Sequence, residues 1–259
     1  MLTGLKILLA EDNPTNQMVA VQMLESLGAD VTLAVDGAEA LEILDQATFD
    51  VALIDIEMPR VSGIDLIRRV RSSSAAVRDM PMIALTAYVM REHRAAIDEA
   101  GADGIIAKPI LSIDQFGTEI LEHCKNRPAA AASENAGAKA ANVDENGAVI
   151  DMEIFDRLAS AFDPAGRIEL SEKVCADVLS ARNSVDSATG SDDFKELCGA
   201  THVLISVAGA IGATRLQSLA QCLNSAGHAA DSSEIGIKGP ELVAEADMVL
   251  DFVRGSLEE

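Results

Sequence analysis

Five polar residues of this chain lie far apart in sequence, yet each stands at the end of a short apolar run. They are Glu11, Asp12, Asp55, Thr86 and Lys108. If the apolar runs are strands of one parallel sheet, the carboxyl ends of those strands meet at a single edge. The sequence therefore predicts that these five side chains converge on one site.

The residue types at this predicted site suit phosphoryl transfer. Carboxylate oxygens, together with a loop carbonyl, are the hard ligands that Mg²⁺ prefers. The Lys108 ammonium would neutralise the non-bridging oxygens of a transferring phosphoryl group, and the Thr86 hydroxyl could hydrogen-bond another of them. One carboxylate is then left to act as the nucleophile.

The elements that must position these residues alternate along the first half of the chain. Short apolar runs predict five strands, at residues 6–11, 31–34, 51–55, 82–86 and 104–108. The stretches between them carry apolar residues at three- and four-residue spacing, which predicts helices. This alternation indicates an α/β domain with a flavodoxin-like, doubly wound, five-stranded parallel sheet.

The second half of the chain has a different pattern. Residues 127–149 are mostly small or polar, which predicts a flexible linker between a first domain at 1–126 and a second at 150–259. Beyond the linker, helical periodicity recurs near 151–162, 166–183, 191–208, 212–228 and 240–256. We therefore expect an all-α second domain.

Charge and composition exclude several classes of function. With 20 Lys and Arg against 42 Asp and Glu, the net charge of -22 repels nucleic-acid phosphate and anionic membrane, so we expect output through protein partners. The N-terminus has too short an apolar run for a signal peptide or a membrane helix, and the four cysteines are scattered. These features predict a cytoplasmic protein without membrane insertion. The sequence also lacks the glycine-rich signature of a kinase ATP-binding domain.

The segments AEDNPTNQ, DIEMPRVSG, ALTA and AKPI resemble, in order and spacing, the signatures of response-regulator receiver domains. The resemblance spans roughly residues 4–125. It implies that Asp55 is the phosphoacceptor and that Thr86 senses the phosphoryl group. It also implies that Lys108 precedes Pro109 at a cis peptide.

The same resemblance implies a complete ligand set for Mg²⁺. Glu11 and Asp12 would bind the ion together with Asp55 and the main-chain carbonyl of Glu57. The expected donor of the phosphoryl group is a histidine kinase.

Three positions of the receiver-like half bear on the switch and on the lifetime of the acyl phosphate. Receivers commonly carry Phe or Tyr where this chain has Ile105, so the usual coupling of Thr86 to an aromatic ring is in doubt. Tyr88 and Glu57, two residues after Thr86 and Asp55 respectively, are expected to tune how long the acyl phosphate lasts.

One histidine of the second half, His202, stands beside a helical seam. The seam consists of apolar or small residues at alternating four- and three-residue steps: Leu197, Thr201, Leu204, Ala208 and Ile211. On the face of His202 lie Ile205, Ser206 and Gly209. Because Ser206 and Gly209 are small, the imidazole could project freely toward an incoming aspartyl phosphate. The alternative is a boundary histidine in an ordinary four-helix bundle.

The surroundings of His202 resemble the core pattern of histidine phosphotransfer (HPt) domains. The matching residues are His202, Leu204, Ala208, Gly212, Ala213 and Leu216. The similarity covers about 150–256 and implies an HPt-like four-helix bundle. Two positions depart from the pattern, because Ile205 replaces the usual Lys and Ser206 the usual Gly. Without that Lys, transfer through His202 is expected to be impaired.

The sequence thus leaves two hypotheses of different classes. In the first, the chain is a phosphorelay intermediate in which Asp55 receives a phosphoryl group from a histidine kinase and passes it to His202 or to a partner. The partner would be a downstream response regulator or an HPt protein. In the second, the helical half is a degenerate HPt domain that only binds partners under the control of Asp55 phosphorylation.

Overall fold

The computed structural model describes residues 1–74, 76–87, 91–110, 112–125, 149–191 and 193–256. The chain forms two compact units, Met1–Lys139 and Ala140–Glu259. The predicted linker lies almost entirely outside the described residues, and so does Tyr88. The two units are described separately below.

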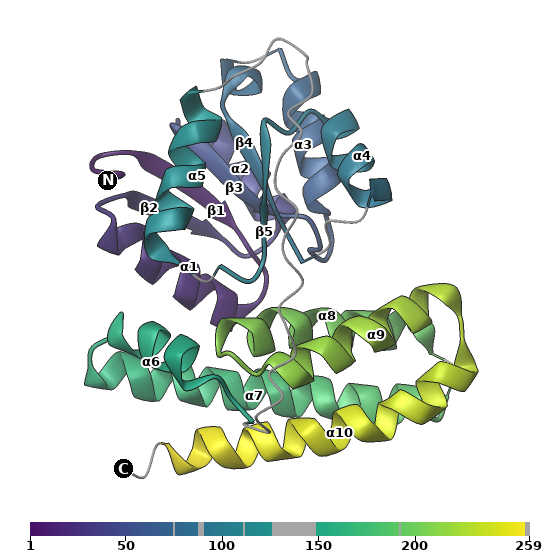
Figure 1. Ribbon diagram of the computed structural model, residues 1–259. Coiled ribbons are helices and arrows are strands. Elements are labelled where there is room, and N and C mark those ends of the chain that lie inside the picture. Colours follow the sequence, from purple (N-terminus) through teal and green to yellow (C-terminus); the bar gives the residue numbers. More distant parts are fainter. Residues whose placement is uncertain (75, 88–90, 111, 126–148, 192, 257–259) are drawn as a thin grey trace. The chain divides into compact units, whose positions relative to one another are not determined.

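The first unit alternates strands and helices as the sequence predicts (Figure 1). Its strands are β1 (Lys6–Ala10), β2 (Asp30–Ala34), β3 (Val51–Asp55), β4 (Met82–Thr86) and β5 (Gly104–Ala107). Its helices are α1 (Pro14–Ser26), α2 (Gly37–Gln46), α3 (Gly63–Ser72), α4 (Arg91–Ala100) and α5 (Ile113–Lys125), with a short 3-10 turn, η1 (Ala76–Asp79). Each strand begins and ends within one residue of its predicted bounds.

The five strands form one parallel sheet in the order β2-β1-β3-β4-β5. The chain moves outward from β1 to β2 and then crosses back to β3 on the other side of β1. The carboxyl ends of β1 and β3 therefore flank the crevice where this topology reverses, which is where such sheets place their sites. The prediction of a doubly wound, flavodoxin-like sheet is confirmed.

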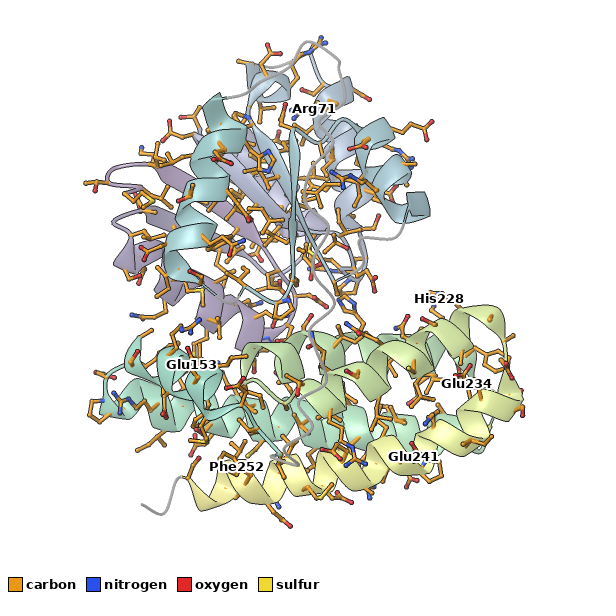
Figure 2. The ribbon with its side chains drawn as sticks, viewed as in Figure 1. Arg71, Glu153, His228, Glu234, Glu241 and Phe252 are labelled. Carbon is orange, nitrogen blue, oxygen red and sulfur yellow. The ribbon has the colours of Figure 1, made fainter. Side chains whose placement is uncertain are left out.

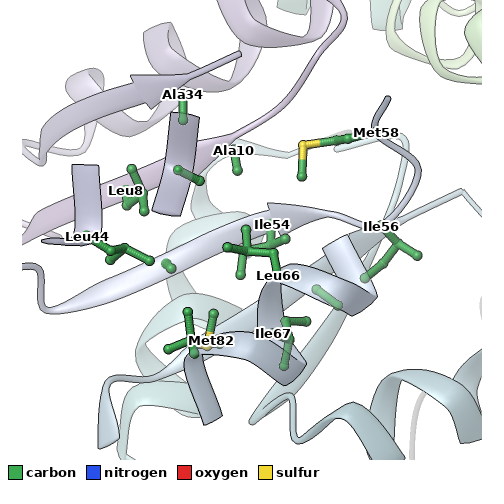
Figure 3. Packing of buried hydrophobic residues seen from close by; sticks show 14 of the residues in the cluster. Leu8, Ala10, Ala34, Leu44, Ile54, Ile56, Met58, Leu66, Ile67 and Met82 are labelled. Atoms are coloured by element: carbon green, nitrogen blue, oxygen red, sulfur yellow. The ribbon is translucent and has the colours of Figure 1, made fainter. Parts of the chain in front are cut away.

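Both faces of the sheet are covered by helices, so its central strands are apolar apart from a polar residue at one end, Lys6 of β1 and Asp55 of β3. Residues 51–54 of β3 and 7–10 of β1 have no exposed surface. On the face covered by α2, α3 and α4, Ile54 and Met82 pack among Leu44, Leu66 and Ile67 (Figure 3). This core fixes the strand ends from which the polar residues project.

Three helices begin with a side-chain N-cap in the loops that follow β1, β2 and β3 at the carboxyl edge of the sheet. Asn13 caps α1, Asp36 caps α2 and Ser62 caps α3, and each side-chain oxygen accepts a main-chain N–H of the first turn. Because the caps fix where the helices begin, they also fix the short loops that precede them.

The second unit is entirely helical in its described residues, as predicted. Its helices are α6 (Met152–Ser160), α7 (Pro164–Thr189), α8 (Phe194–Ala210), α9 (Thr214–Ala229) and α10 (Ser232–Gly255). Helix α7 packs on α8 and α10, and α9 packs on the same two helices, which makes a four-helix bundle. The short α6 is joined to it by an edge-to-face contact between Phe155 and Phe252, whose ring centroids are 5.9 Å apart. Phe252 is labelled on α10 in Figure 2.

Helix α10 differs from its predicted extent, because it starts at Ser232 and not near residue 240. Its N-cap is Asp231, whose carboxylate accepts the N–H groups of Ser233 and Glu234 at 3.1 Å. An acidic residue three positions after a capping residue is a helix-start signal. This signal extends the helix through Pro240, where the sequence pattern placed the beginning.

None of the described helices is long and apolar enough to cross a membrane.

Candidate phosphoryl-acceptor site

The five predicted site residues lie at one edge of the sheet. Asp55 and Thr86 are the last residues of β3 and β4, and Lys108 directly follows β5. Glu11 and Asp12 directly follow β1, and one oxygen of each of Glu11, Asp12 and Asp55 lies within 4.8 Å of the others. The convergence expected from the sequence is therefore present.

Lys108 bridges two carboxylates of this edge. Its Nζ donates to Glu11 Oε2 at 2.6 Å and to Asp55 Oδ2 at 2.7 Å, and all three side chains are at most 5% exposed. The burial of Lys108 by itself would lower its pKa, but Asp55 and Glu11 together hold that pKa above its ordinary value. The ammonium is thus charged and directed at Asp55.

Glu11 titrates differently from an ordinary glutamate. Burial raises the pKa of its carboxyl to about 7, and the negative charge of Asp55 adds to this effect while Lys108 opposes it. Two carboxylates share a single ammonium here, so an excess of negative charge is concentrated at the edge. A further cation would relieve it.

Two asparagines at the start of α1 orient Glu11: the N-cap Asn13, and Asn16 in the first turn. Asn16 Nδ2 donates to Glu11 Oε1 at 3.0 Å, and the Asn13 N–H donates to the same oxygen at 3.3 Å. Asn13 is also the N-cap of α1, so the cap and the acidic residue form one unit. Asn16 was not among the residues predicted for the site. Its only sequence signal was its place three residues after a helix cap.

The loop between β3 and α3 returns tightly over the end of β3. The Glu57 N–H donates to Asp55 Oδ1 at 3.2 Å, and the Gly63 N–H donates to the Ile56 carbonyl at 3.0 Å. A Cβ at position 63 would clash with the Asp55 carbonyl, so only glycine fits there. The loop therefore keeps the main chain of Glu57 beside the Asp55 carboxylate.

Three further expectations from the receiver resemblance concern the Lys108–Pro109 peptide, the pair of Thr86 and Ile105, and Tyr88. The Lys108–Pro109 peptide is cis, as the resemblance implies. Thr86 is buried, and Ile105, which stands where receivers commonly carry an aromatic residue, is half-buried on β5 opposite Ala84. The proposed tuning role of Tyr88 falls outside the described residues.

The donor set fits a hard divalent cation. Glu11, Asp12 and Asp55 supply carboxylate oxygens from two neighbouring loops, and all three are close enough to share one ion. These residues offer oxygen donors, which favours Mg²⁺ over metals that prefer sulfur or imidazole.

His202 lies in the middle of α8, in the second unit. The predicted seam on this helix is confirmed, because its members are buried in the bundle: Leu197, Thr201, Leu204, Ala208 and Ile211. The imidazole is only 9% exposed, and Ile205 and Ser206 are 1% and 3% exposed. His202 is therefore packed against other side chains, whereas the sequence left room for it to stand clear.

An α/β domain of this topology, with a lysine bridging buried carboxylates at the carboxyl edge of its sheet, belongs to the flavodoxin-like class. Residues 7–120 match the response regulator receiver domain family. This part of the chain therefore belongs to that family and is a receiver domain of two-component signalling.

Two of the relatives that the chain resembles are sensor proteins. The chain is 26% identical over 261 residues to the aerobic respiration control sensor protein ArcB of Escherichia coli (strain K12), an alignment that covers 100% of this chain and 31% of ArcB. It is 28% identical over 222 residues to the sensor protein GacS of Pseudomonas syringae pv. syringae, covering 83% of this chain and 24% of GacS. The chain thus spans about a third or less of the length of these relatives.

Among solved structures, the chain is similar to the receiver domain of the sensor histidine kinase PA1611 from Pseudomonas aeruginosa PAO1. The identity is 37%, the match covers 46% of this chain and 96% of that one, and the TM-score is 0.43. The description of that structure includes a magnesium ion in its active site cleft.

Proposed function

We propose that this chain is a phosphorelay protein in which Asp55 accepts a phosphoryl group from the phosphohistidine of a histidine kinase. The observation that carries the proposal is the contact of Lys108 Nζ with Asp55 Oδ2 and Glu11 Oε2, beside the three clustered carboxylates. In this proposal the protein acts in the cytoplasm, through protein partners.

The chemistry requires one bond to form and one to break. An Asp55 carboxylate oxygen forms a P–O bond while the P–N bond of the donor phosphohistidine breaks. The donor imidazole leaves with the electron pair of the P–N bond and takes up a proton. Lys108 neutralises charge on the transferred group, and Thr86, one strand away, hydrogen-bonds one of its oxygens.

The ligands proposed for Mg²⁺ are Glu11, Asp12, Asp55 and the carbonyl of Glu57. A bound Mg²⁺ supplies positive charge beside the phosphoryl oxygens. The protein determines where Mg²⁺ would bind, because Asn13 and Asn16 orient Glu11 and the Glu57 N–H orients Asp55.

We further propose that the helical unit is an HPt-like domain and that His202 receives the phosphoryl group from Asp55 or from a partner's receiver. The seam beside His202 and the four-helix bundle support this step. The alignment with ArcB along the whole chain agrees with it. In either route the P–O bond of the donor aspartyl phosphate, on Asp55 or on the partner's receiver, breaks as an imidazole nitrogen of His202 forms the new P–N bond, and the aspartate leaves as a carboxylate with the electron pair.

Ile205 favours a second candidate function, a binding module in which His202 carries no phosphate. The usual cation of HPt domains is absent at this position, and Ile205 is 1% exposed. An apolar side chain there cannot neutralise a phosphoryl group on His202.

The test is to phosphorylate the chain with a histidine kinase or acetyl phosphate and Mg²⁺, and to map the label in wild type, Asp55→Asn and His202→Gln. We expect label on Asp55, and label on His202 that disappears in Asp55→Asn. Label confined to Asp55 with every donor would favour the binding module, and no label on Asp55 would overturn the proposal.

A matched pair of variants tests the role of Ile205. Ile205→Lys adds an ammonium one turn from His202 and is expected to speed transfer to it. Its aliphatic stem must run along the helix for the charge to reach water. Ile205→Met has a similar length without charge and serves as the control. Equal transfer rates in the two variants would contradict the charge argument.

A further inference from the structure

The loop between β3 and α3 determines where the Glu57 main chain lies. Its N–H faces Asp55 Oδ1, and its carbonyl is the proposed fourth ligand of the cation. The loop ends where Ser62 caps α3 and Gly63 contacts the end of β3. Between these two ends, Met58 and Val61 are buried in the core, and the Val61 N–H donates to the Pro59 carbonyl at 2.8 Å. Arg60 lies between these buried residues and contacts the rest of the domain through its side chain.

Arg60 lies in the middle of this loop in an unusual backbone conformation. Its φ is +64°, in the left-handed region that residues with a Cβ rarely adopt. Glycine would take this conformation without strain. Arginine is therefore less favourable than glycine for the main chain at this position, so any advantage of Arg60 comes from its side chain.

The Arg60 guanidinium forms an ion pair with Asp36 of the preceding βα connection. Asp36 is 3% exposed, and its Oδ1 accepts the N–H groups of Ala38 and Glu39 at 2.8 and 2.9 Å. The carboxylate is thus fixed to the first turn of α2, and α2 packs on the sheet. Arg60 connects the loop to a rigid point of the domain.

A second contact between the same two segments is steric. A Cβ at position 37, the first residue of α2, would clash with the Val61 carbonyl. Helix α2 and the β3–α3 loop therefore lie in direct van der Waals contact. The ion pair between Arg60 and Asp36 joins the same two segments. If the loop moved away from α2, both the contact of Gly37 with Val61 and the ion pair of Arg60 with Asp36 would be lost.

We propose that Arg60 is a positioning residue of the acceptor site: its ion pair with Asp36 fixes the β3–α3 loop so that the Glu57 main chain faces Asp55. The inference rests on the proposed function of Asp55 and extends it to a residue that acts through the loop. Residues that hydrogen-bond directly to metal ligands change metal affinity by about 10- to 100-fold when removed. The Arg60 side chain is 64% exposed and acts one contact further from the ligands, so we expect an effect no larger than the lower end of this range.

The experiment compares Mg²⁺ binding among variants of the full chain. Amide NMR titrations give the Mg²⁺ dissociation constant, and thermal unfolding without Mg²⁺ gives the stability. We expect Arg60→Ala to weaken Mg²⁺ binding by about tenfold. Arg60→Lys, which keeps the charge, should restore part of the loss. Arg69→Ala is the control, since it removes an equal charge from the exposed face of α3.

Arg60→Gly separates positioning from fold stability. It removes the ion pair and also the strain at φ +64°, so its unfolding temperature should exceed that of Arg60→Ala. Its Mg²⁺ affinity should nevertheless be as weak. Asp36→Asn should weaken binding like Arg60→Ala, and the double variant should be no weaker than either single one.

Two results would overturn the inference. One is an unchanged Mg²⁺ dissociation constant in Arg60→Ala, and the other is additive losses in the double variant. Both are distinct from failure of the proposed function, in which the wild-type chain itself takes no phosphate on Asp55. A wild type that is phosphorylated while Arg60→Ala binds Mg²⁺ normally would reject only the role of Arg60.

Discussion

At the scale of single residues, the Lys108 ammonium is the central group of the candidate acceptor site at the carboxyl edge of the sheet, which we call the acceptor edge. Lys108 contacts Glu11 and Asp55, Asn13 and Asn16 at the start of α1 donate to the other oxygen of Glu11, and the Glu57 N–H donates to the other oxygen of Asp55. Glu11 and Asp55 are therefore each oriented by more than one donor, so their positions are defined before any ligand arrives.

Replacing Lys108 by methionine should slow phosphorylation of Asp55 by about 10²- to 10³-fold, because the removed donor faces the charge that develops on the phosphoryl group. The measurement is the rate of label incorporation from acetyl phosphate. Lys6→Met, an exposed lysine at the opposite end of β1, is the matched control. A decrease no larger than in this control would contradict the assigned role.

The residue scale also marks the limit of what the sequence could predict. Glu11, Asp12, Asp55, Thr86 and Lys108 could be placed because each follows an apolar run, and strand order does the rest. The pair of Arg60 with Asp36 could not, since it depends on the approach of two loops that no periodicity encodes. The 9% exposure of His202 depends on packing in the same way.

At the scale of elements, side-chain hydrogen bonds join helices to strands at points away from the acceptor edge. Arg71 at the end of α3 is one such point (Figure 2). Its Nε donates to Gly101 O at 2.8 Å, and its other nitrogens reach the carbonyls of Arg78 and Met80 and the carboxylate of Asp103. One side chain thus connects α3, η1, the short segment before β4 and the turn between α4 and β5.

We expect Arg71→Met to lower the free energy of unfolding by about 3 kcal/mol, because several partly buried acceptors lose a charged donor at once. Chemical denaturation measures the change. Arg68→Met, on the exposed face of the same helix, should change it by less than about 0.5 kcal/mol. Similar losses in the two variants would mean that Arg71 contributes little beyond its surface charge.

The helical unit has a comparable joint between α8 and α9. The buried Asn224 Nδ2 donates to Thr201 Oγ1 at 2.8 Å and to the Cys198 carbonyl at 3.0 Å. A buried amide of this kind fixes the register of two helices, since sliding either one leaves polar groups unpaired.

Asn224→Ala should therefore reduce the free energy of unfolding of the helical unit by about 2 kcal/mol, through lost hydrogen bonds and lost packing. Helical circular dichroism during denaturation reports it. Gln221→Ala, at an exposed position one turn earlier, provides the comparison. A loss shared equally by both variants would show that the Asn224 contacts carry no special weight.

Element boundaries show why sequence patterns succeed in one unit and are less exact in the other. The central strands β1, β3 and β4 have apolar interiors that stop at a polar residue, such as Asp55 in β3 or Thr86 in β4, so their carboxyl ends are sharp. Helix α10 has no such contrast before Pro240, and the cap at Asp231 determines its start. The sequence pattern placed the start of α10 at Pro240, whereas in the structure the capping hydrogen bonds of Asp231 determine where the helix begins.

At the scale of the whole molecule, the chain consists of two compact units with separate cores. One core lies around the sheet and the other along the axis of the bundle. Cores of this kind support independent folding when each unit buries enough apolar surface.

We expect a fragment of residues 1–126 to bind Mg²⁺ and accept phosphate on Asp55 as the full chain does, with an unfolding temperature within a few degrees of the corresponding transition there. Calorimetry of the fragment and of the full chain provides the comparison. A fragment of residues 1–107 lacks Lys108 and α5 and should fail in both respects. Loss of folding in the longer fragment would show that the two units stabilise each other.

The sequence separation within the acceptor edge has a consequence for synthesis of the chain. Glu11 and Lys108 are 97 residues apart, and they meet only after β5 has paired with β4. Until the ribosome has released that last strand, Asp55 has no ammonium beside it. Under the proposed function, a nascent or misfolded chain without β5 would therefore lack the ammonium that neutralises the phosphoryl group, and we expect Asp55 to accept phosphate only after the sheet is complete.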